Sequence, residues 1–258
     1  MRYTQETGEI LQKKEVAPGI YDIIIHLPKI AKAASVGQFV NISCGGFTLR
    51  RPISLCGFDQ KLGTVRLVFE VRGEGTKCLA EYSVGDMLDV VGPLGHGFSM
   101  TDSAKKAVIV GGGIGTPPLL PVAEFYRQNA VVITGFRTAS AAILQQDFAA
   151  AGAKTILCTD DGSAGYHGFT TQALEEYLDE NGCDIIYTCG PRAMMKGIAK
   201  LALERGIDCQ VSLEERMGCG VGVCMCCVCA TKGKKGMQYS RVCLNGPVFS
   251  ASEVDWDV

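Results

Sequence analysis

The stretch Ala107-Val-Ile-Val-Gly-Gly-Gly-Ile-Gly-Thr-Pro-Pro-Leu-Leu120 carries an apolar run into four glycines and then into a helix start marked by prolines. The run indicates a buried strand, and prolines suit the first turn of a helix. A strand that turns directly into a helix aims backbone N–H groups and the positive helix end at one point, where a pyrophosphate can bind. Gly111, Gly112, Gly113 and Gly115 are the candidate contacts. A tight turn without a ligand would use the same residues, because the spacing is not the G-x-G-x-x-G fingerprint.

The same alternation continues on both sides of this stretch. Apolar runs recur at 107–110, 131–135, 155–158, 185–189 and 210–213. Helical patterns separate them at 118–128, 141–150, 170–180 and 193–205. Alternating strands and helices at this spacing predict a parallel sheet covered by helices on both faces. We therefore expect a nucleotide-binding α/β domain over residues 103–213.

In residues 1–102, predicted strands follow one another without long helices between them. Short runs rich in Val, Ile, Leu and Phe lie between turn residues, at 19–28, 39–44, 53–57, 65–72 and 87–91. The one helix candidate is short and covers 76–82. Closely spaced strands separated by Gly, Pro, Asp and Asn predict an antiparallel barrel or sandwich.

Three further short motifs suit ligand binding. Arg50-Arg51-Pro52-Ile53-Ser54 offers a guanidinium and a hydroxyl beside a fixed backbone, which suits a flavin phosphate. Gly73-Glu-Gly-Thr76 adds a turn with free N–H groups. Cys189-Gly190-Pro191 ends a strand at the edge where open sheets bind ligands. Each also has a plain structural explanation, as a strand connection or as a buried cysteine before a helix.

The cysteines give the strongest signal. The chain has 13, and six of them lie between Cys219 and Cys243. Cys219, Cys224 and Cys227 follow the C-x4-C-x2-C spacing of plant-type [2Fe–2S] proteins if Cys226 is skipped, and Cys243 supplies a distant fourth thiolate. Spacing alone does not decide between Cys226 and Cys227.

The glycines of this segment support the same hypothesis. Gly218, Gly220 and Gly222 allow positive φ and a close approach of N–H groups to sulfur. The segment 214–258 is too small to build a good core by itself, so we expect a small iron–sulfur domain that folds round its metal centre.

Zinc is the alternative metal. Cys224 with Cys227, and Cys226 with Cys229, form C-x2-C pairs of the kind that four-thiolate zinc sites use. Zinc would not need Cys219 or the glycine-rich loop. A Rieske centre would need two histidines, and all three histidines of the chain lie outside the cysteine segment.

Together the motifs resemble the ferredoxin–NADP reductase superfamily, in the order Arg51–Ser54, Gly75-Thr76, Gly111–Leu120 and Cys189–Pro191. The tail, with Glu215-Arg-Met-Gly-Cys-Gly-Val-Gly-Val-Cys224 and Val242-Cys-Leu-Asn-Gly-Pro-Val-Phe249, resembles the electron-transfer subunits of class 1B dihydroorotate dehydrogenases. That resemblance covers nearly the whole chain. It implies FAD on the barrel, NAD on the α/β domain and one [2Fe–2S] cluster in the tail.

The resemblance also implies a partner and particular residues. The partner is an FMN-containing dihydroorotate dehydrogenase catalytic subunit of pyrimidine biosynthesis, in a heterotetramer with two copies of each chain. The implied flavin contacts are Arg51, Pro52, Ile53, Ser54, Val68, Phe69, Glu70, Gly75 and Thr76, and the implied cluster ligands are Cys219, Cys224, Cys227 and Cys243. Glu70 stands where some members of the family have Arg, so we expect only a backbone contact there.

Composition narrows the class of protein. Hydrophobic residues make up 47% and charged residues 20%, as in globular proteins. A net charge of −2 leaves no basic excess for nucleic acid. The start lacks an apolar signal segment, and the uncharged stretch 107–123 is broken by glycines and prolines. We expect a cytoplasmic protein that does not enter a membrane.

The three expected sites imply a converter between hydride and single electrons. Nicotinamide exchanges hydride, an iron–sulfur cluster exchanges one electron, and a flavin does both. No catalytic acid, base or nucleophile stands out, so we expect another protein to handle the organic substrate. Two alternatives stay open, another flavin/iron–sulfur NAD(P)H reductase component, linked to an oxygenase, ferredoxin or sulfide, and a zinc-stapled nucleotide-binding module. The choice between NADH and NADPH stays open, because Arg137 could either bind a 2′-phosphate or face solvent.

Overall fold

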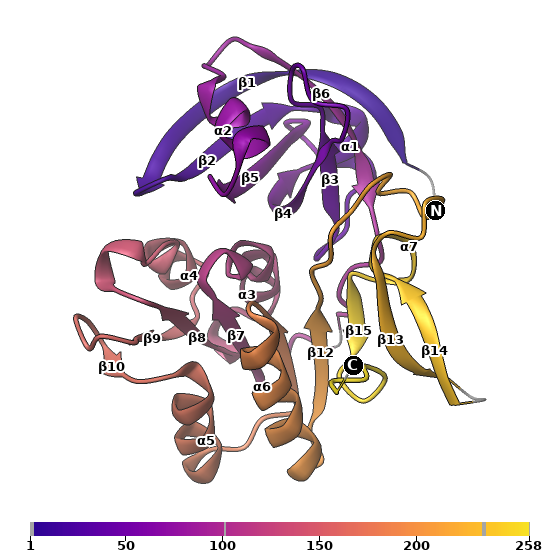
Figure 1. The fold of residues 1–258 in the computed structure, drawn as a ribbon. Helices are drawn as coiled ribbons and strands as arrows, with labels where there is room; N and C mark the ends of the chain where they lie inside the picture. The colour runs from indigo at the N-terminus through magenta and orange to yellow at the C-terminus, as the bar shows by residue number, and fades with distance from the viewer. Residues whose placement is uncertain (1–2, 101, 234–235, 258) are drawn as a thin grey trace.

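The computed structural model describes residues 3–100, 102–233 and 236–257. Figure 1 shows a barrel above a layered α/β domain, with the C-terminal segment packed along one side of both. This arrangement confirms the predicted combination of an antiparallel barrel, a parallel-sheet domain and a small C-terminal segment.

Six strands close the barrel in the order β1-β2-β5-β4-β3-β6. They are β1 (Thr4–Ala17), β2 (Ile20–His26), β3 (Phe39–Ile42), β4 (Arg51–Asp59), β5 (Thr64–Glu70) and β6 (Met87–Leu94), with α1 (Pro28–Ala33) and α2 (Glu74–Glu81) between them. Inward-facing Ile23, Ile25, Val40 and Leu67 form its core. Closure removes exposed sheet edges, which distinguishes the barrel from a sandwich.

Sequence reasoning missed β1 and α1. The residues of β1 are mostly Gln, Glu, Lys and Thr, and few of them are buried. The strand forms because it pairs with β2 on one side and with β6 on the other, so backbone hydrogen bonds hold it where apolar burial is small.

The α/β domain is a seven-stranded sheet of order β10-β9-β8-β7-β11-β12-β15. Its strands are β7 (Ala107–Gly112), β8 (Ala130–Phe136), β9 (Lys154–Thr159), β10 (Tyr166–His167), β11 (Ile185–Cys189), β12 (Asp208–Ser212) and β15 (Val248–Ser250). The five predicted strands are present and run parallel, whereas β15 pairs antiparallel with β12.

Helices cover both faces of this sheet, as expected. They are α3 (Leu120–Tyr126), α4 (Gln145–Ala150), α5 (Thr170–Glu180) and α6 (Arg192–Glu204). Alternate residues of β7 face opposite sides, because Ile109 packs with α3 and α4 while Val108 and Val110 pack with α5 and α6.

The strand order reverses between β7 and β11. The chain runs outward through β7, β8 and β9, and then returns to the other side of β7 as β11, where Gly111 lies opposite Cys189. In open parallel sheets, ligands bind outside the carboxyl ends of the strands at such a switch point.

The segment after β7 differs from the predicted single helix over 118–128. Two 3₁₀ turns, η1 (Gly113–Gly115) and η2 (Pro117–Leu119), precede α3, and a third, η3 (Arg127–Asn129), follows it. Pro117 and Pro118 have no N–H to donate, so a regular α-helix begins only after them. The predicted helix over 141–150 is likewise shorter, because η4 (Ala139–Ala141) precedes α4.

The C-terminal segment is packed into the rest of the fold. A hairpin of β13 (Val228–Gly233) and β14 (Gly236–Arg241) leads into the short α7 (Val242–Asn245), and β15 then joins the α/β sheet. Cys227 and Cys243 share a core with Phe39 and Leu94 of the barrel. The domain division at 102 and 213 stays a prediction. No helix in the described ranges is long and apolar enough to cross a membrane.

Candidate functional site

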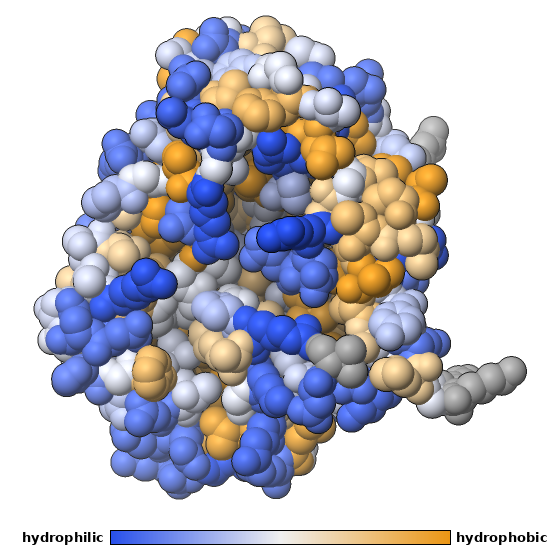
Figure 2. All heavy atoms as spheres, in the orientation of Figure 1, coloured by the Kyte–Doolittle hydropathy of each residue, from blue (hydrophilic) through white to orange (hydrophobic). Residues whose placement is uncertain are grey.

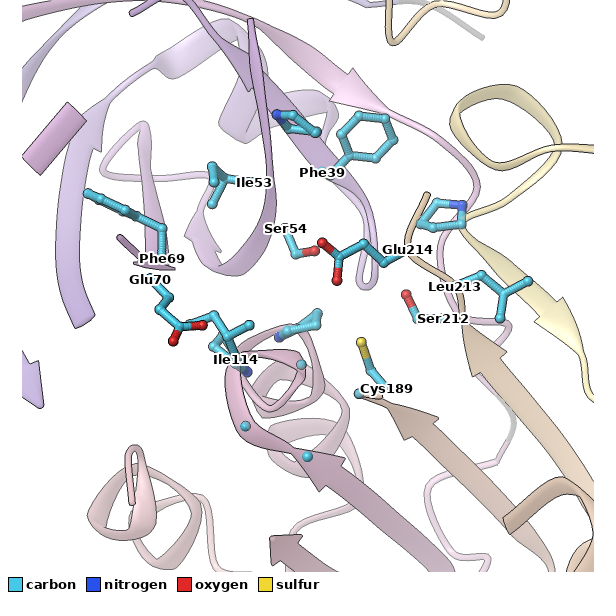
Figure 3. A pocket seen from close by; sticks show the side chains of 18 of the residues that line it. Phe39, Ile53, Ser54, Phe69, Glu70, Ile114, Cys189, Ser212, Leu213 and Glu214 are labelled. Carbon is cyan, nitrogen blue, oxygen red and sulfur yellow. The ribbon is translucent and has the colours of Figure 1, made fainter. Parts of the chain in front are cut away.

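A cleft of about 520 Å³ lies between the barrel and the carboxyl edge of the sheet (Figure 3). Strands β4 and β5 form its barrel wall, and the loops after β7, β11 and β12 form the other. The sequence-predicted residues that line it are Pro52, Ile53, Ser54, Val68, Phe69, Glu70, Thr76, Gly112, Gly113, Gly115, Cys189, Gly190 and Pro191. Two barrel strands and two sheet loops that lie far apart in sequence therefore face one space.

Arg51 and Gly75 lie behind this lining, against each other. A Cβ added to Gly75 would come within 1.8 Å of Arg51 Nε, so a side chain there would displace the guanidinium from this position. Arg51 donates to the Leu49 carbonyl at 2.5 Å and lies over the Phe47 ring. Because Gly75 is in the first turn of α2, the guanidinium and the positive helix end act at the same place. The site suits a phosphate.

The hydroxyl of Thr76 shapes this turn. It accepts the backbone N–H of Arg72 at 2.9 Å and that of Gly73 at 3.2 Å. The hydroxyl is therefore engaged in capping α2, and the turn presents backbone N–H groups to a ligand.

The carboxylate of Glu70 has a partner in the chain. It accepts a hydrogen bond from Arg72 Nε at 2.6 Å, and both residues line the cleft. Its negative charge is thereby balanced locally. Sequence reasoning missed Arg72, although a basic residue two positions along from Glu70 was a usable signal.

The glycines after β7 have separate tasks. Gly111 is buried and makes room for Thr116, whose Oγ1 would lie 2.9 Å from an added Cβ. Gly115 lies against Gly190, where a Cβ would meet backbone N and Cα at 2.6 Å. Gly113, at φ +51°, has open space at its Cβ position. The loops of β7 and β11 thus touch at the crevice, and Gly113 faces it.

Cys189 directs its sulfur into the cleft beside Ser212 (Figure 3). Burial raises the pKa of its thiol to about 12, although a hydrogen bond with Ser212 acts in the opposite direction. The thiol is therefore neutral at physiological pH.

Several lining residues were not predicted, among them Phe39, Ile114, Ser212, Leu213 and Glu214. Ser212 ends β12, and Leu213 and Glu214 follow it, at the same sheet edge as Cys189. Because open α/β sheets bind ligands at the carboxyl ends of their strands, this position could have indicated all three. Phe39 carries no signal in the sequence.

The cysteine loop begins just beyond this wall. Cys219 Sγ accepts backbone N–H groups from Val221 at 3.4 Å, Val223 at 3.3 Å and Cys224 at 3.4 Å. Cys224 Sγ accepts the N–H of Cys219 at 3.4 Å. Such N–H···S contacts stabilise thiolates.

The other two predicted ligands form a second pair. The N–H of Cys243 donates to Cys227 Sγ at 3.4 Å, and both cysteines are buried. The four thiols thus form two pairs, Cys219 with Cys224 and Cys227 with Cys243. A two-iron cluster with four thiolates takes two on each iron, which these pairs offer. Within the described ranges, no three side chains of His, Cys, Asp or Glu are placed to hold a single ion.

The thiol pKa differs between Cys219 of the first pair and Cys243 of the second. Burial opposes ionisation of Cys219, but its backbone hydrogen bonds prevail and lower the pKa to about 6. Burial and the neighbouring Cys227 raise the pKa of Cys243 to about 12. Cys219 is therefore prepared as a thiolate, whereas Cys243 needs a metal to ionise.

The backbone of the loop confirms the expectation of positive φ at two glycines. Gly220 has φ +70° and Gly222 has φ +86°, and Met225 also lies in this region at +59°. At Gly218 the close approach of a sulfur favours glycine, because a Cβ there would lie 3.2 Å from Cys224 Sγ. Of the two adjacent thiols, Cys226 is exposed.

Residues 214–255 match the family model described as the iron–sulfur cluster binding domain of dihydroorotate dehydrogenase B. The dihydroorotate dehydrogenase B (NAD(+)) electron transfer subunit of Caldanaerobacter subterraneus subsp. tengcongensis is 38% identical, over 96% of this chain and 97% of its own length. That of Geobacillus thermodenitrificans is 39% identical, over 97% and 98%. This chain belongs to that family.

Solved structures agree on the fold. A chain from the NADH-dependent reduced ferredoxin-NADP oxidoreductase, studied for flavin-based electron bifurcation, has a TM-score of 0.87 and 33% identity, with 97% of this chain and 90% of that one covered. The ferredoxin reductase of carbazole 1,9a-dioxygenase has a TM-score of 0.67 and 20% identity, with 80% and 67% covered. The latter similarity concerns the fold alone.

Proposed function

We propose that this chain is an electron-transfer subunit that passes electrons between an FMN-containing dihydroorotate dehydrogenase subunit and NAD⁺, through a [2Fe–2S] cluster and FAD. One observation carries the proposal. Leu213, Glu214, Glu215 and Met217 line the cleft, and Cys219 follows two residues later in the same segment. The wall of the flavin and nicotinamide site therefore continues directly into the cluster loop.

The barrel side would hold FAD. Arg51 and the N–H groups at the start of α2 would bind the pyrophosphate, and Pro52, Ile53 and Ser54, which line the cleft, would contact the flavin. Bound FAD supplies the exchange between hydride and single electrons. Capping by Thr76 fixes the turn in advance, so the N–H groups need no rearrangement on binding.

The sheet side would hold NAD. Gly113 leaves space for the pyrophosphate, and the contact of Gly115 with Gly190 fixes the crevice at the switch point. Cys189 stays a neutral thiol, so it places no charge beside the nicotinamide. The opposite wall of the cleft is formed by Val68, Phe69 and the backbone of Glu70. The loops on the sheet side are shaped by Gly111, Gly112 and Pro191.

The cysteine pairs would hold the cluster near a partner. Val223 and Met225, between and beside the ligands, are 79% and 53% exposed. Figure 2 shows beige and orange side chains gathered on this side of the molecule. An exposed apolar patch of this kind marks a protein interface. The catalytic subunit would dock there, in a heterotetramer of two copies of each chain, and thiolates that must bind iron favour the reducing cytoplasm.

The bifurcating oxidoreductase gives a second candidate function, because its architecture matches so closely. In that case the electron partner would be a ferredoxin-linked flavoprotein. The two functions differ in whether dihydroorotate delivers electrons.

Replacing Arg51 by alanine should weaken FAD retention roughly ten- to a hundredfold. A hydrogen bond to a charged group contributes about 1.5–3 kcal/mol, and the substitution removes a charge-assisted one. The measurement is FAD dissociation followed by fluorescence. Lys77→Ala, on the exposed side of the same helix α2, is the control and should leave retention unchanged. Equal retention in Arg51→Ala would show that the phosphate binds elsewhere.

The function itself is tested on the chain without its partner. Loaded with FAD, it should oxidise NADH with an artificial electron acceptor and should not oxidise dihydroorotate. The first result follows from the facing flavin and nicotinamide walls. The second follows because removal of a proton beside a carbonyl needs a positioned base, and the proposal assigns that base to the FMN-containing partner subunit. A chain inert toward NADH would contradict the proposal.

A further inference from the structure

The loop between Cys219 and Cys224 is held by two side chains from different parts of the fold. Asn41 of β3 donates from Nδ2 to the Cys219 carbonyl at 3.4 Å. Arg241, the last residue of β14, donates from Nη1 to the Gly222 carbonyl at 2.6 Å. With its carbonyls bound from outside, the loop can turn its N–H groups toward the Cys219 sulfur.

The two anchors differ in charge. Asn41 is neutral and 1% exposed. Arg241 carries a full positive charge and is only half-buried. Arg241 is in none of the ion pairs of the described residues, so no carboxylate there is in direct contact with its guanidinium.

Arg241 is also fixed relative to the second cysteine pair. Its backbone N–H donates to Asn245 Oδ1 at 2.9 Å, and the next residue begins α7, which carries Cys243. The guanidinium therefore lies against the loop of the first pair, and the backbone of the same residue is hydrogen-bonded to the helix of the second.

A fixed cation at this position acts on electron transfer. Four thiolates make a [2Fe–2S] site negative, and reduction adds one further negative charge. The cation stabilises the reduced state more than the oxidised state, since Coulomb attraction grows with the charge that it faces. Charge and hydrogen bonds near the sulfurs are known determinants of cluster potentials.

We propose that Arg241 is a positioning residue that raises the reduction potential of the cluster, through its charge as well as its hold on the loop. The inference rests on the proposed ligation by the four cysteines. A higher potential makes the cluster a better acceptor for electrons from the partner and a weaker donor to FAD, so Arg241 adjusts the balance between the two directions.

The test is an EPR-monitored redox titration of the full, cluster-loaded chain. Arg241→Gln keeps an amide donor and loses the charge, whereas Arg241→Lys keeps the charge and loses the planar fork. We expect Arg241→Gln to shift the equilibrium at least tenfold toward the oxidised cluster, which is 59 mV for a one-electron couple. Arg241→Lys should stay much closer to the unmodified chain.

Arg205→Gln is the matched control. It removes the same charge at the end of α6, where Arg205 pairs with Asp179, and it should not change the potential. An unchanged potential in Arg241→Gln would overturn the proposal, and so would equal shifts in the Gln and Lys variants, since geometry alone would then account for them.

A further variant covers the case in which Arg241→Gln does not retain iron. Arg241→His carries a charge that disappears as the pH rises past about 6.5. Its potential should fall over that range relative to the unmodified chain, and a parallel pH course would overturn the proposal. Absence of a cluster in the unmodified chain would instead refute the proposed function, so the two failures are distinguishable.

Discussion

Replacing Cys219, Cys224, Cys227 or Cys243 singly by serine is expected to abolish the cluster's visible absorption and EPR signal. Each substitution would remove one of the four proposed thiolate ligands, and the three that remain would not hold a two-iron core. The pairs are already formed by backbone contacts, in which the N–H of Cys224 reaches Cys219 and that of Cys243 reaches Cys227. Iron and sulfide content should fall with the spectrum.

Cys226→Ser and Cys229→Ser are the matched controls and should keep both signals. Cys226 is exposed, next to the buried Cys227. Cys229 is buried, and burial raises the pKa of its thiol to about 11. A normal cluster in Cys227→Ser together with loss in Cys226→Ser would show that the third ligand is the other thiol.

Gly115→Ala should remove NADH oxidation, with a loss of at least about a hundredfold in kcat/KM. The added methyl would meet backbone atoms of Gly190 at 2.6 Å, and backbone cannot rotate away as a side chain can. The loops of β7 and β11 must then separate at the point where the nucleotide would bind. A misplacement of about 1 Å can cost a hundredfold in rate.

The same variant should keep FAD and the cluster, because the nearest atoms to the added methyl belong to Gly190 and Cys189 and not to Arg51, Gly75 or the cysteine loop. Gly182→Ala is the control, since an added Cβ there has no neighbour within 4 Å. Normal NADH oxidation by Gly115→Ala would place the nucleotide away from this crevice.

Patterns of local sequence predicted most of the architecture. The run from Ala107 to Leu120 indicated the central strand and its glycine turn, and the cysteine spacing indicated the loop. Both signals are local, because a strand needs a continuous apolar run and a cluster loop needs ligands at fixed intervals. The β1 strand gave no such signal, since pairing on both sides holds it in place of apolar burial.

The rest depends on which strands become neighbours. Cys189 and Gly111 face each other only because β11 returns beside β7, and no residue in either strand encodes that order. Phe39 likewise enters the cleft through the packing of barrel strand β3, which no local pattern indicates. The preparation of Cys219 as a thiolate also arises from three-dimensional contacts, because three N–H groups of the folded loop surround its sulfur.

The most direct test of the account is dihydroorotate-dependent formation of NADH, measured with this chain, its FMN-containing partner subunit and NAD⁺. The account predicts NADH formation when both subunits are present and none when either is omitted, with loss of the activity in Cys243→Ser although both flavins remain bound. NADH formation by this chain alone, or undiminished activity without the cluster, would contradict it.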